Sequence, residues 1–302
     1  MGARLSLVFI LLPLFVTTRA LAAEPPLRVV TTTNMIADLV TNVGGNRVVV
    51  TSLMGPGVDP HLYKATQGDL EQLTGADVIF YNGLHLEGKM TEVFEKLRER
   101  RPIFAVTDDI DRKLLRTPEE FAGNFDPHIW FDVRLWISAV TTVERLLGEQ
   151  RPRDRENFQA NAARYREQLQ KLDQWVGAEL RKVSKPQRVL ITAHDAFGYF
   201  GRAYDIEVMG LQGVSTASEY GLHDLQRLSD LIVARKVKAI FVESSVPEKF
   251  ILSLQRGVQA RGHDVKIGGQ LFSDAMDAPD KPGGTYIGMV TENVKTIVSA
   301  LQ

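Results

Sequence analysis

The chain of 302 residues contains no cysteine. We therefore expect no disulfide bonds and no lipid anchor of the kind that is attached to a cysteine. The sequence also lacks a glycine-rich phosphate loop, zinc-finger spacing, a low-complexity tract and a long histidine-rich segment. Its formal charge of −1 is spread without strong acidic or basic runs, so nucleic acid is not an expected partner.

The N-terminus has the features of a secretory signal peptide. Arg4 precedes an apolar run at 5–16, and the small residues Ala-Leu-Ala at 20–22 form a cleavage site. The run is shorter than the ~20 residues of a membrane span, and no later stretch is long and apolar enough. We predict a signal peptide at 1–23 and a mature protein in a bacterial periplasm. An uncleaved anchor is the alternative.

Apolar, β-rich runs alternate with helical patterns in two parts of the chain. The first group of runs lies at 27–33, 47–54, 77–83 and 102–107. The second group lies at 187–193, 206–213, 239–245 and 264–269. Such alternation is typical of parallel sheets covered by helices. The sequence predicts an α/β fold with two parallel-sheet lobes, at 24–150 and 186–302.

The segment between the predicted lobes has the pattern of a single amphipathic helix. Its apolar residues recur at steps of three and four: Phe158, Ala162, Tyr165, Leu169, Leu172, Val176, Leu180 and Val183. About 28 helical residues reach ~40 Å, which is enough to run along both lobes. We predict a rigid connecting helix within 151–185 that resists large opening motions.

Two of the six histidines follow the dipeptide Asp-Pro, namely His61 and His128. One interpretation is structural, because Asp can cap a helix and Pro suits its first position. The other is that both loops present an imidazole to one metal ion. His194 directly follows the predicted strand 187–193, and ligands of open α/β sheets bind beyond the carboxyl ends of strands.

A fourth metal ligand is expected from the second lobe, because ligands distant in sequence suit a site at a domain junction. Asp274 is the best candidate, since it lies just beyond the predicted strand 264–269. Asp277 and Asp280 are close rivals on spacing alone. A metal cleft between the lobes would result.

Other polar and aromatic residues receive less specific interpretations. We expect three histidines to lie outside the site: His85, His223 and His263. Glu219 follows Ser215 and Thr216, which have the pattern of a capped helix start, so its expected role is structural. The candidates for orienting the ligand rings are Asn34, Glu243 and Ser244. The aromatic candidates for excluding water are Trp130, Phe197 and Tyr199.

Seven motifs in order resemble those of one family across essentially the whole mature chain. They are DPHLYKATQGDL, NGLHLEGKM, DPHIWFDV, TAHDAFGYFGRAY, LQGVSTASE, FVESSVPEK and LFSDAM…GGTYIGMVTENV. The chain resembles the metal-binding subunits of ABC importers for zinc and manganese, and its motifs are most similar to the TroA-type members. The resemblance implies two α/β lobes, a rigid helical backbone and one ion bound between the lobes.

The resemblance also implies the ligands, residue by residue. The first two histidine ligands of the family match His61 and His128. The third ligand, which is Glu in manganese-restricted members, matches His194, and the carboxylate matches Asp274. The chain lacks the histidine-rich loop of many zinc-specific members, so the transported ion is expected to be Zn²⁺ and/or Mn²⁺.

The leading functional hypothesis is a monomeric periplasmic carrier that delivers a divalent ion to an ABC permease and performs no chemistry. A zinc-dependent hydrolase is one alternative, because three histidines and an open position can activate water. Asp274 would close that position, and the chain lacks the His-Glu-x-x-His helix of many metalloproteases. The third hypothesis is a surface adhesin with bound metal.

Overall fold

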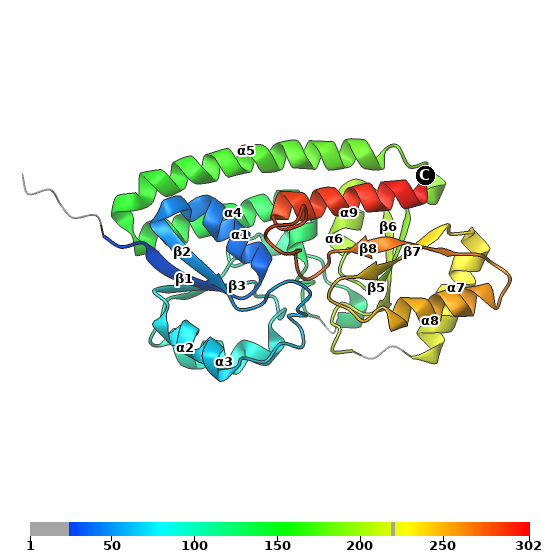
Figure 1. Cartoon of the computed structure of the whole chain (residues 1–302), viewed down its shortest axis with the longest axis horizontal. Coiled ribbons are helices and arrows are strands. Elements are labelled where there is room, and N and C mark those ends of the chain that lie inside the picture. The colour runs from blue at the N-terminus through cyan, green and yellow to red at the C-terminus, as the bar shows by residue number, and fades with distance from the viewer. Residues whose placement is uncertain (1–23, 122, 219–220) are drawn as a thin grey trace, which may run out of the picture.

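The computed structural model describes residues 24–121, 123–218 and 221–302, and shows two lobes beneath two long helices (Figure 1). The signal peptide predicted at 1–23 and the prediction for Glu219 lie outside the described residues. Within them, no helix has both the length and the apolar character needed to cross a membrane.

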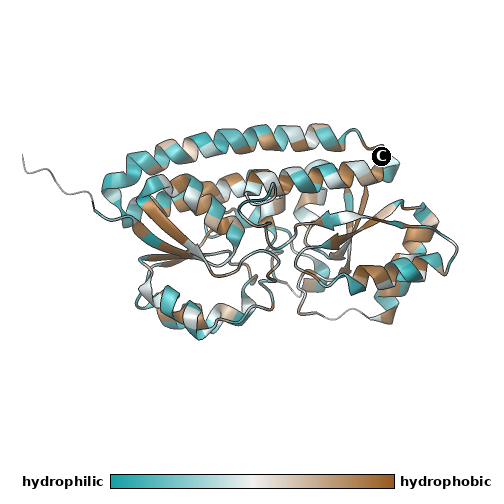
Figure 2. Ribbon diagram, in the orientation of Figure 1, coloured by the Kyte–Doolittle hydropathy of each residue, from teal (hydrophilic) through white to brown (hydrophobic). Residues whose placement is uncertain are grey.

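The first lobe contains a four-stranded parallel sheet in the order β2-β1-β3-β4. Its strands are β1 (Leu27–Thr31), β2 (Val48–Ser52), β3 (Val78–Tyr81) and β4 (Ile103–Ala105). Its helices are α1 (Asn34–Gly44), α2 (Gln67–Gly75), α3 (Thr91–Arg98) and α4 (Val133–Gln150). The apolar strands form the interior in Figure 2, as expected of a sheet that is covered on both faces.

The second lobe contains two parallel strand pairs, β5-β6 and β7-β8. The strands are β5 (Val189–His194), β6 (Glu207–Gln212), β7 (Ala239–Glu243) and β8 (Lys266–Leu271). The helices are α6 (Gly198–Tyr204), α7 (Leu222–Arg235) and α8 (Lys249–Gln259). β5 and β7 lie side by side at the centre of the lobe (Figure 1), so all four strands end at the same side.

One long helix, α5 (Arg155–Leu180), runs along both lobes (Figure 1). Its 26 residues span ~39 Å. The buried positions are those that the periodicity predicted: Phe158, Ala162, Tyr165, Leu169, Leu172, Val176 and Leu180. Val183 of the predicted pattern is also buried, but it lies beyond the end of α5. α5 packs against α1 and α4 of the first lobe and against the C-terminal helix α9 (Tyr286–Leu301). The expected fold of two parallel-sheet lobes joined by a long helix is confirmed.

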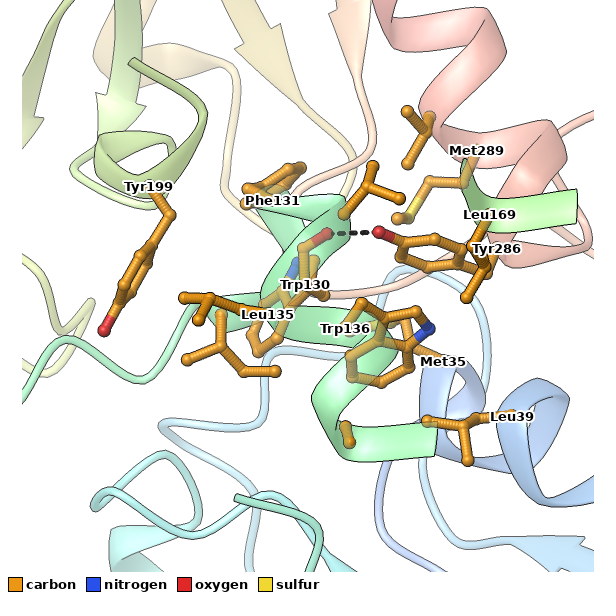
Figure 3. Packing of buried hydrophobic residues seen from close by; sticks show 14 of the residues in the cluster. Met35, Leu39, Trp130, Phe131, Leu135, Trp136, Leu169, Tyr199, Tyr286 and Met289 are labelled. Atoms are coloured by element: carbon orange, nitrogen blue, oxygen red, sulfur yellow. Dashed lines mark hydrogen bonds between the residues drawn. The ribbon is translucent and has the colours of Figure 1, made fainter. Parts of the chain in front are cut away.

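The hydrophobic core continues from the first lobe into the second. One cluster of buried side chains extends from Leu27 in β1 to Leu301 in α9. At its centre the rings of Trp136 and Tyr286 stack with centroids 5.1 Å apart, and the Tyr286 hydroxyl donates to the Trp130 carbonyl (Figure 3). A shared close-packed core opposes hinge motion between lobes, because opening would separate its layers.

Short 3₁₀ turns connect several elements of the described chain: Gly45–Arg47, Gly88–Met90, Arg112–Leu114, Glu119–Phe121, Ile129–Phe131, Pro152–Asp154 and Lys185–Gln187. The turn at Ile129–Phe131, η5, follows His128 directly. It leads through Asp132, whose side chain accepts from the Arg134 amide, into α4. The second Asp-Pro-His segment is therefore held at the start of a buried helix.

The predicted helix start at Ser215 and Thr216 is wrong. α7 begins at Leu222, and the Ser218 amide donates to the Ser215 carbonyl in a turn. The Thr216 hydroxyl instead donates to Asp59 of the first lobe, at 2.6 Å. A contact between lobes, which the local sequence does not reveal, takes the place of the expected helix cap.

Candidate metal centre

Three imidazoles and one carboxylate converge where the lobes meet. The Nε2 atoms of His61 and His128 are 3.3 Å apart. The Asp274 carboxylate lies 3.4 Å from Nε2 of His128, 3.2 Å from Nε2 of His194 and 3.8 Å from Nε2 of His61. All four residues are buried, with at most 3% of their surface exposed.

Three of these four separations, from 3.2 to 3.4 Å, are close to those around one tetrahedral ion. Ligand atoms that lie ~2.0–2.1 Å from a tetrahedral Zn²⁺ are about 3.3–3.4 Å from one another. Nε2 of His194 and both carboxylate oxygens of Asp274 have no hydrogen-bond partner among the described residues. Buried polar atoms without partners are costly, and a bound cation would be a partner for Nε2 of His194 and for the Asp274 carboxylate.

The strands explain how residues so distant in sequence meet. His61 lies in the loop after β2, His194 is the last residue of β5, and Asp274 lies in the loop after β8. His128 precedes the turn η5. The carboxyl ends of the strands in both lobes therefore face one junction, as the position of ligand sites in α/β sheets predicts. His194 is the last residue of β5, whereas the predicted strand ended at residue 193.

The two Asp-Pro-His segments adopt the same local turn. In each, the Asp carboxylate accepts the backbone amide of the His: Asp59 for His61 at 2.9 Å and Asp126 for His128 at 3.0 Å. Such a turn fixes the backbone of the His without placing it in a helix. The repeated tripeptide thus directs two imidazoles to one point, and neither histidine lies within a helix.

Carboxylates orient two of the three rings. Nδ1 of His128 lies 2.8 Å from Asp126, and Nδ1 of His194 lies 2.6 Å from Glu243. Each leaves Nε2 directed at the junction, as metal-binding histidines require. Nδ1 of His61 has no hydrogen-bond partner within the described ranges. Glu243 was a predicted orienting residue, whereas Asp126 was missed because its position suggested only a cap.

The same contacts shift the pKa values of the rings in opposite directions. Burial lowers the pKa of His61 to about 3. Burial also disfavours charge on His128, but the hydrogen bond to Asp126 and the neighbouring Asp274 carboxylate outweigh it and raise the pKa to about 9. For His194, Glu243 and Asp274 together outweigh burial and raise the pKa well above its ordinary value.

The Asp274 carboxyl is kept ionised although it is fully buried. Burial favours its protonated form, but the neighbouring His194 and His128 lower its pKa well below the ordinary value. The ion-free centre therefore holds protonated rings beside an anionic carboxylate. A divalent cation can replace two protons there without a change in net charge.

Hydrogen bonds from the first lobe fix the loop that carries Asp274. The Trp130 indole donates to the Ser273 carbonyl at 3.0 Å. The Asn34 amide donates to the Met276 carbonyl and accepts the Met276 amide. Asn34 thus holds the Asp274 loop and does not contact a ligand ring. Because the loop is held on both sides of Asp274, at Ser273 and at Met276, its carboxylate has a defined place.

The remaining predicted residues have other surroundings. Ser244 donates to the Ala275 carbonyl at 3.5 Å. The Phe197 ring packs against Phe131, with centroids 4.2 Å apart, and so belongs to the core. The Tyr199 hydroxyl donates to the Asp126 carbonyl at 2.9 Å. Trp130 lies edge-on to His128, with ring centroids 5.2 Å apart, and covers it.

The other histidines and the rival carboxylates lie outside the four-residue cluster. His85 is exposed and lines a separate cavity of about 600 Å³ in the first lobe. His223 is exposed at the start of α7, and Nε2 of His263 lies 2.8 Å from the Val237 carbonyl. Asp277 accepts the neighbouring Ala278 amide. Asp280 is exposed.

Fold and site together define a class of protein, the solute-binding proteins with two lobes on a helical backbone and a metal centre between them. The family model described as "Zinc-uptake complex component A periplasmic" matches residues 29–300. The chain therefore belongs to this family, the metal-binding subunits of ABC importers. The family consists of transport proteins, not enzymes, as the prediction of a carrier that performs no chemistry requires.

Individual relatives agree with the family. The chain is 50% identical to "Manganese-binding lipoprotein MntA" of Bacillus subtilis, covering 93% of this chain and 92% of that protein. It is 53% identical to "Zinc-binding protein TroA" of Treponema pallidum, covering 93% and 90%. The solved structure of the periplasmic zinc-binding protein TroA from Treponema pallidum superimposes with a TM-score of 0.89, covering 91% of this chain and 99% of that one.

Proposed function

We propose that this protein captures a divalent transition metal ion through His61, His128, His194 and Asp274 and delivers it to a membrane permease. The observation that carries the proposal is the convergence of four buried ligand atoms within 4.8 Å of one another. Two of these residues come from each predicted lobe, 24–150 and 186–302, with 151–185 as the connection. We propose a monomer that acts in the periplasm.

The donor set favours zinc over manganese. Manganese is at the weak end of the divalent series for a given nitrogen and oxygen site. Both oxygens of Asp274 face the junction without hydrogen-bond partners among the described residues, so the carboxylate can bind through both and raise the coordination number. That arrangement would let manganese bind as well. The two relatives named for manganese and zinc are similarly close, at 50% and 53% identity.

Titration of ligand variants tests the site. We expect His61→Ala, His128→Ala, His194→Ala and Asp274→Ala each to weaken Zn²⁺ binding strongly, because each removes one donor. His85→Ala and His223→Ala are matched controls and should bind Zn²⁺ like the parent, since both residues are exposed away from the cluster. Unchanged affinity in one of the first four variants would remove that residue from the proposed site.

Competition between the two ions tests the proposed selectivity. Protein equilibrated with equimolar Zn²⁺ and Mn²⁺ at neutral pH and then washed should retain mainly zinc, while titration with Mn²⁺ alone should still show binding. Recovery of manganese alone from the mixture would contradict the proposal. Uptake of radiolabelled metal by a deletion strain, with and without the gene restored, would test delivery to a permease.

A further inference from the structure

Arg116 lies between the two lobes, beside the metal centre but outside the ligand set. Its Nη1 atom is 2.6 Å from Oδ2 of Asp126, and its Nη2 atom is 4.0 Å from Oδ2 of Asp195. Asp126 orients the ring of His128, and Asp195 follows His194 directly in the chain. One guanidinium group thus faces carboxylates that adjoin a ligand histidine from each lobe.

The Arg116 guanidinium lies directly against Gly198 of the second lobe. A Cβ atom on Gly198, at the start of α6, would lie 1.1 Å from Nη1 of Arg116. The Tyr199 ring lies 5.8 Å from the guanidinium carbon, and its hydroxyl accepts the Arg116 amide at 3.0 Å while donating to the Asp126 carbonyl. Both the backbone and the side chain of Arg116 are therefore held.

The two oxygens of Asp126 have separate partners. Oδ1 accepts the His128 amide and lies 2.8 Å from Nδ1 of the ring. Oδ2 accepts a hydrogen bond from Nη1 of Arg116. The Asp126 side chain is fully buried, so loss of the guanidinium would leave a buried carboxylate oxygen without this charged donor. Such a carboxylate can rotate or pair elsewhere, and the ring of His128 would lose its fixed direction.

We propose that Arg116 is a positioning residue for metal binding. It acts through Asp126 on the orientation of His128, while Gly198, Tyr199 and Asp195 of the second lobe hold the guanidinium in place. This inference rests on the proposed function of the site. The guanidinium does not contact the ion, so its effect must pass through Asp126. That requirement makes the effects of substitutions at the two positions non-additive.

A double-mutant cycle tests this dependence. We expect Arg116→Met and Asp126→Asn each to raise the Kd for Zn²⁺ by about 10–100-fold, the usual cost of losing an outer partner of a metal ligand. The double variant should bind little worse than Asp126→Asn. Arg116→Lys keeps one charge near Asp126 and should recover part of the affinity. Independent, additive losses would overturn the inference, as would parental affinity in Arg116→Met.

Substitution of Gly198 tests the same contact without changing a charge. Gly198→Ala should displace the guanidinium and weaken Zn²⁺ binding as Arg116→Met does. Gly75→Ala is the matched control, because Gly75 also lies at a helix end and its added Cβ would meet no atom within 4 Å. The control should bind like the parent. Equal affinity of Gly198→Ala and the parent would contradict the inference.

Absorption spectra of Co²⁺-loaded protein separate ligand orientation from general stability. A turned His128 ring should change the visible bands in Arg116→Met, whereas a change in stability alone would shift only the melting temperature. If Arg116→Met does not fold, Arg116→Lys and Gly198→Ala decide the question. If the parental protein binds no Zn²⁺, the proposed function itself is refuted. If the parental protein and the Arg116 variants bind Zn²⁺ equally well, only this inference is refuted.

Discussion

Binding of a divalent ion should release two protons near neutral pH. In the ion-free protein the pKa of His128 is raised to about 9, and the pKa of His194 is raised well above its ordinary value. At pH 7 both rings are then almost fully protonated, about 100 to 1 for His128 by the difference of two pH units. Burial keeps His61 neutral, with a pKa of about 3. Coordination requires a free lone pair on every Nε2, so two rings must lose a proton.

This proton release sets how affinity depends on pH. With two protons released, the apparent affinity should rise by about 100-fold for each unit of pH between about pH 6 and 8, because each proton contributes about tenfold per unit. The rise should become less steep as pH passes the pKa of His128, which is about 9 in the ion-free protein, because that ring then has no proton to release. Below that value protons compete with the ion, and acid therefore weakens binding.

Isothermal titration in buffers of different ionisation enthalpy measures the number of protons directly. Asp126→Asn removes the carboxylate that helps to raise the pKa of His128, so the release should fall from two protons to about one. His85→Ala should leave it at two, since His85 lies outside the cluster. Release of no proton by the parent at pH 7, or of two by Asp126→Asn, would refute the reasoning.

Three further predictions follow from the same geometry. Dialysis at about pH 4 should remove the bound ion because protons compete for the imidazoles, and metal retained under that condition would contradict a three-histidine site. Glu243→Gln should weaken Zn²⁺ binding by about 10–100-fold in calorimetric titration, since Nδ1 of His194 loses its anionic partner. Small-angle scattering with and without Zn²⁺ should show little change in shape, because one core spans both lobes; a large closure would oppose that expectation.

Periodicity was sufficient to predict the long helix and the strands. The buried positions of α5, from Phe158 to Leu180, recur at helical spacing, and the strands are continuous apolar runs. The resemblance to a family, together with the position of His61 and His128 in identical tripeptides, suggested the cluster. These are local or motif-level signals, so they can be read from the chain without knowledge of its packing.

Tertiary contacts account for what the sequence did not reveal. Thr216 bonds Asp59 of the other lobe instead of capping a helix. His194 belongs to β5 because the strand continues to its last residue, where the His194 amide donates to Glu243 at 2.9 Å. The role of Asp126 depends on how the His128 ring turns towards it. No spacing rule predicts such pairs, because the fold brings them together.

The location of a bound ion tests the central claim most directly. Crystals of the Zn²⁺-loaded protein should give one strong anomalous difference peak at the zinc absorption edge, ~2.0–2.1 Å from Nε2 of His61, His128 and His194 and within bonding distance of the Asp274 carboxylate. A peak at another place, such as beside His85, or no peak between these four residues would contradict the account.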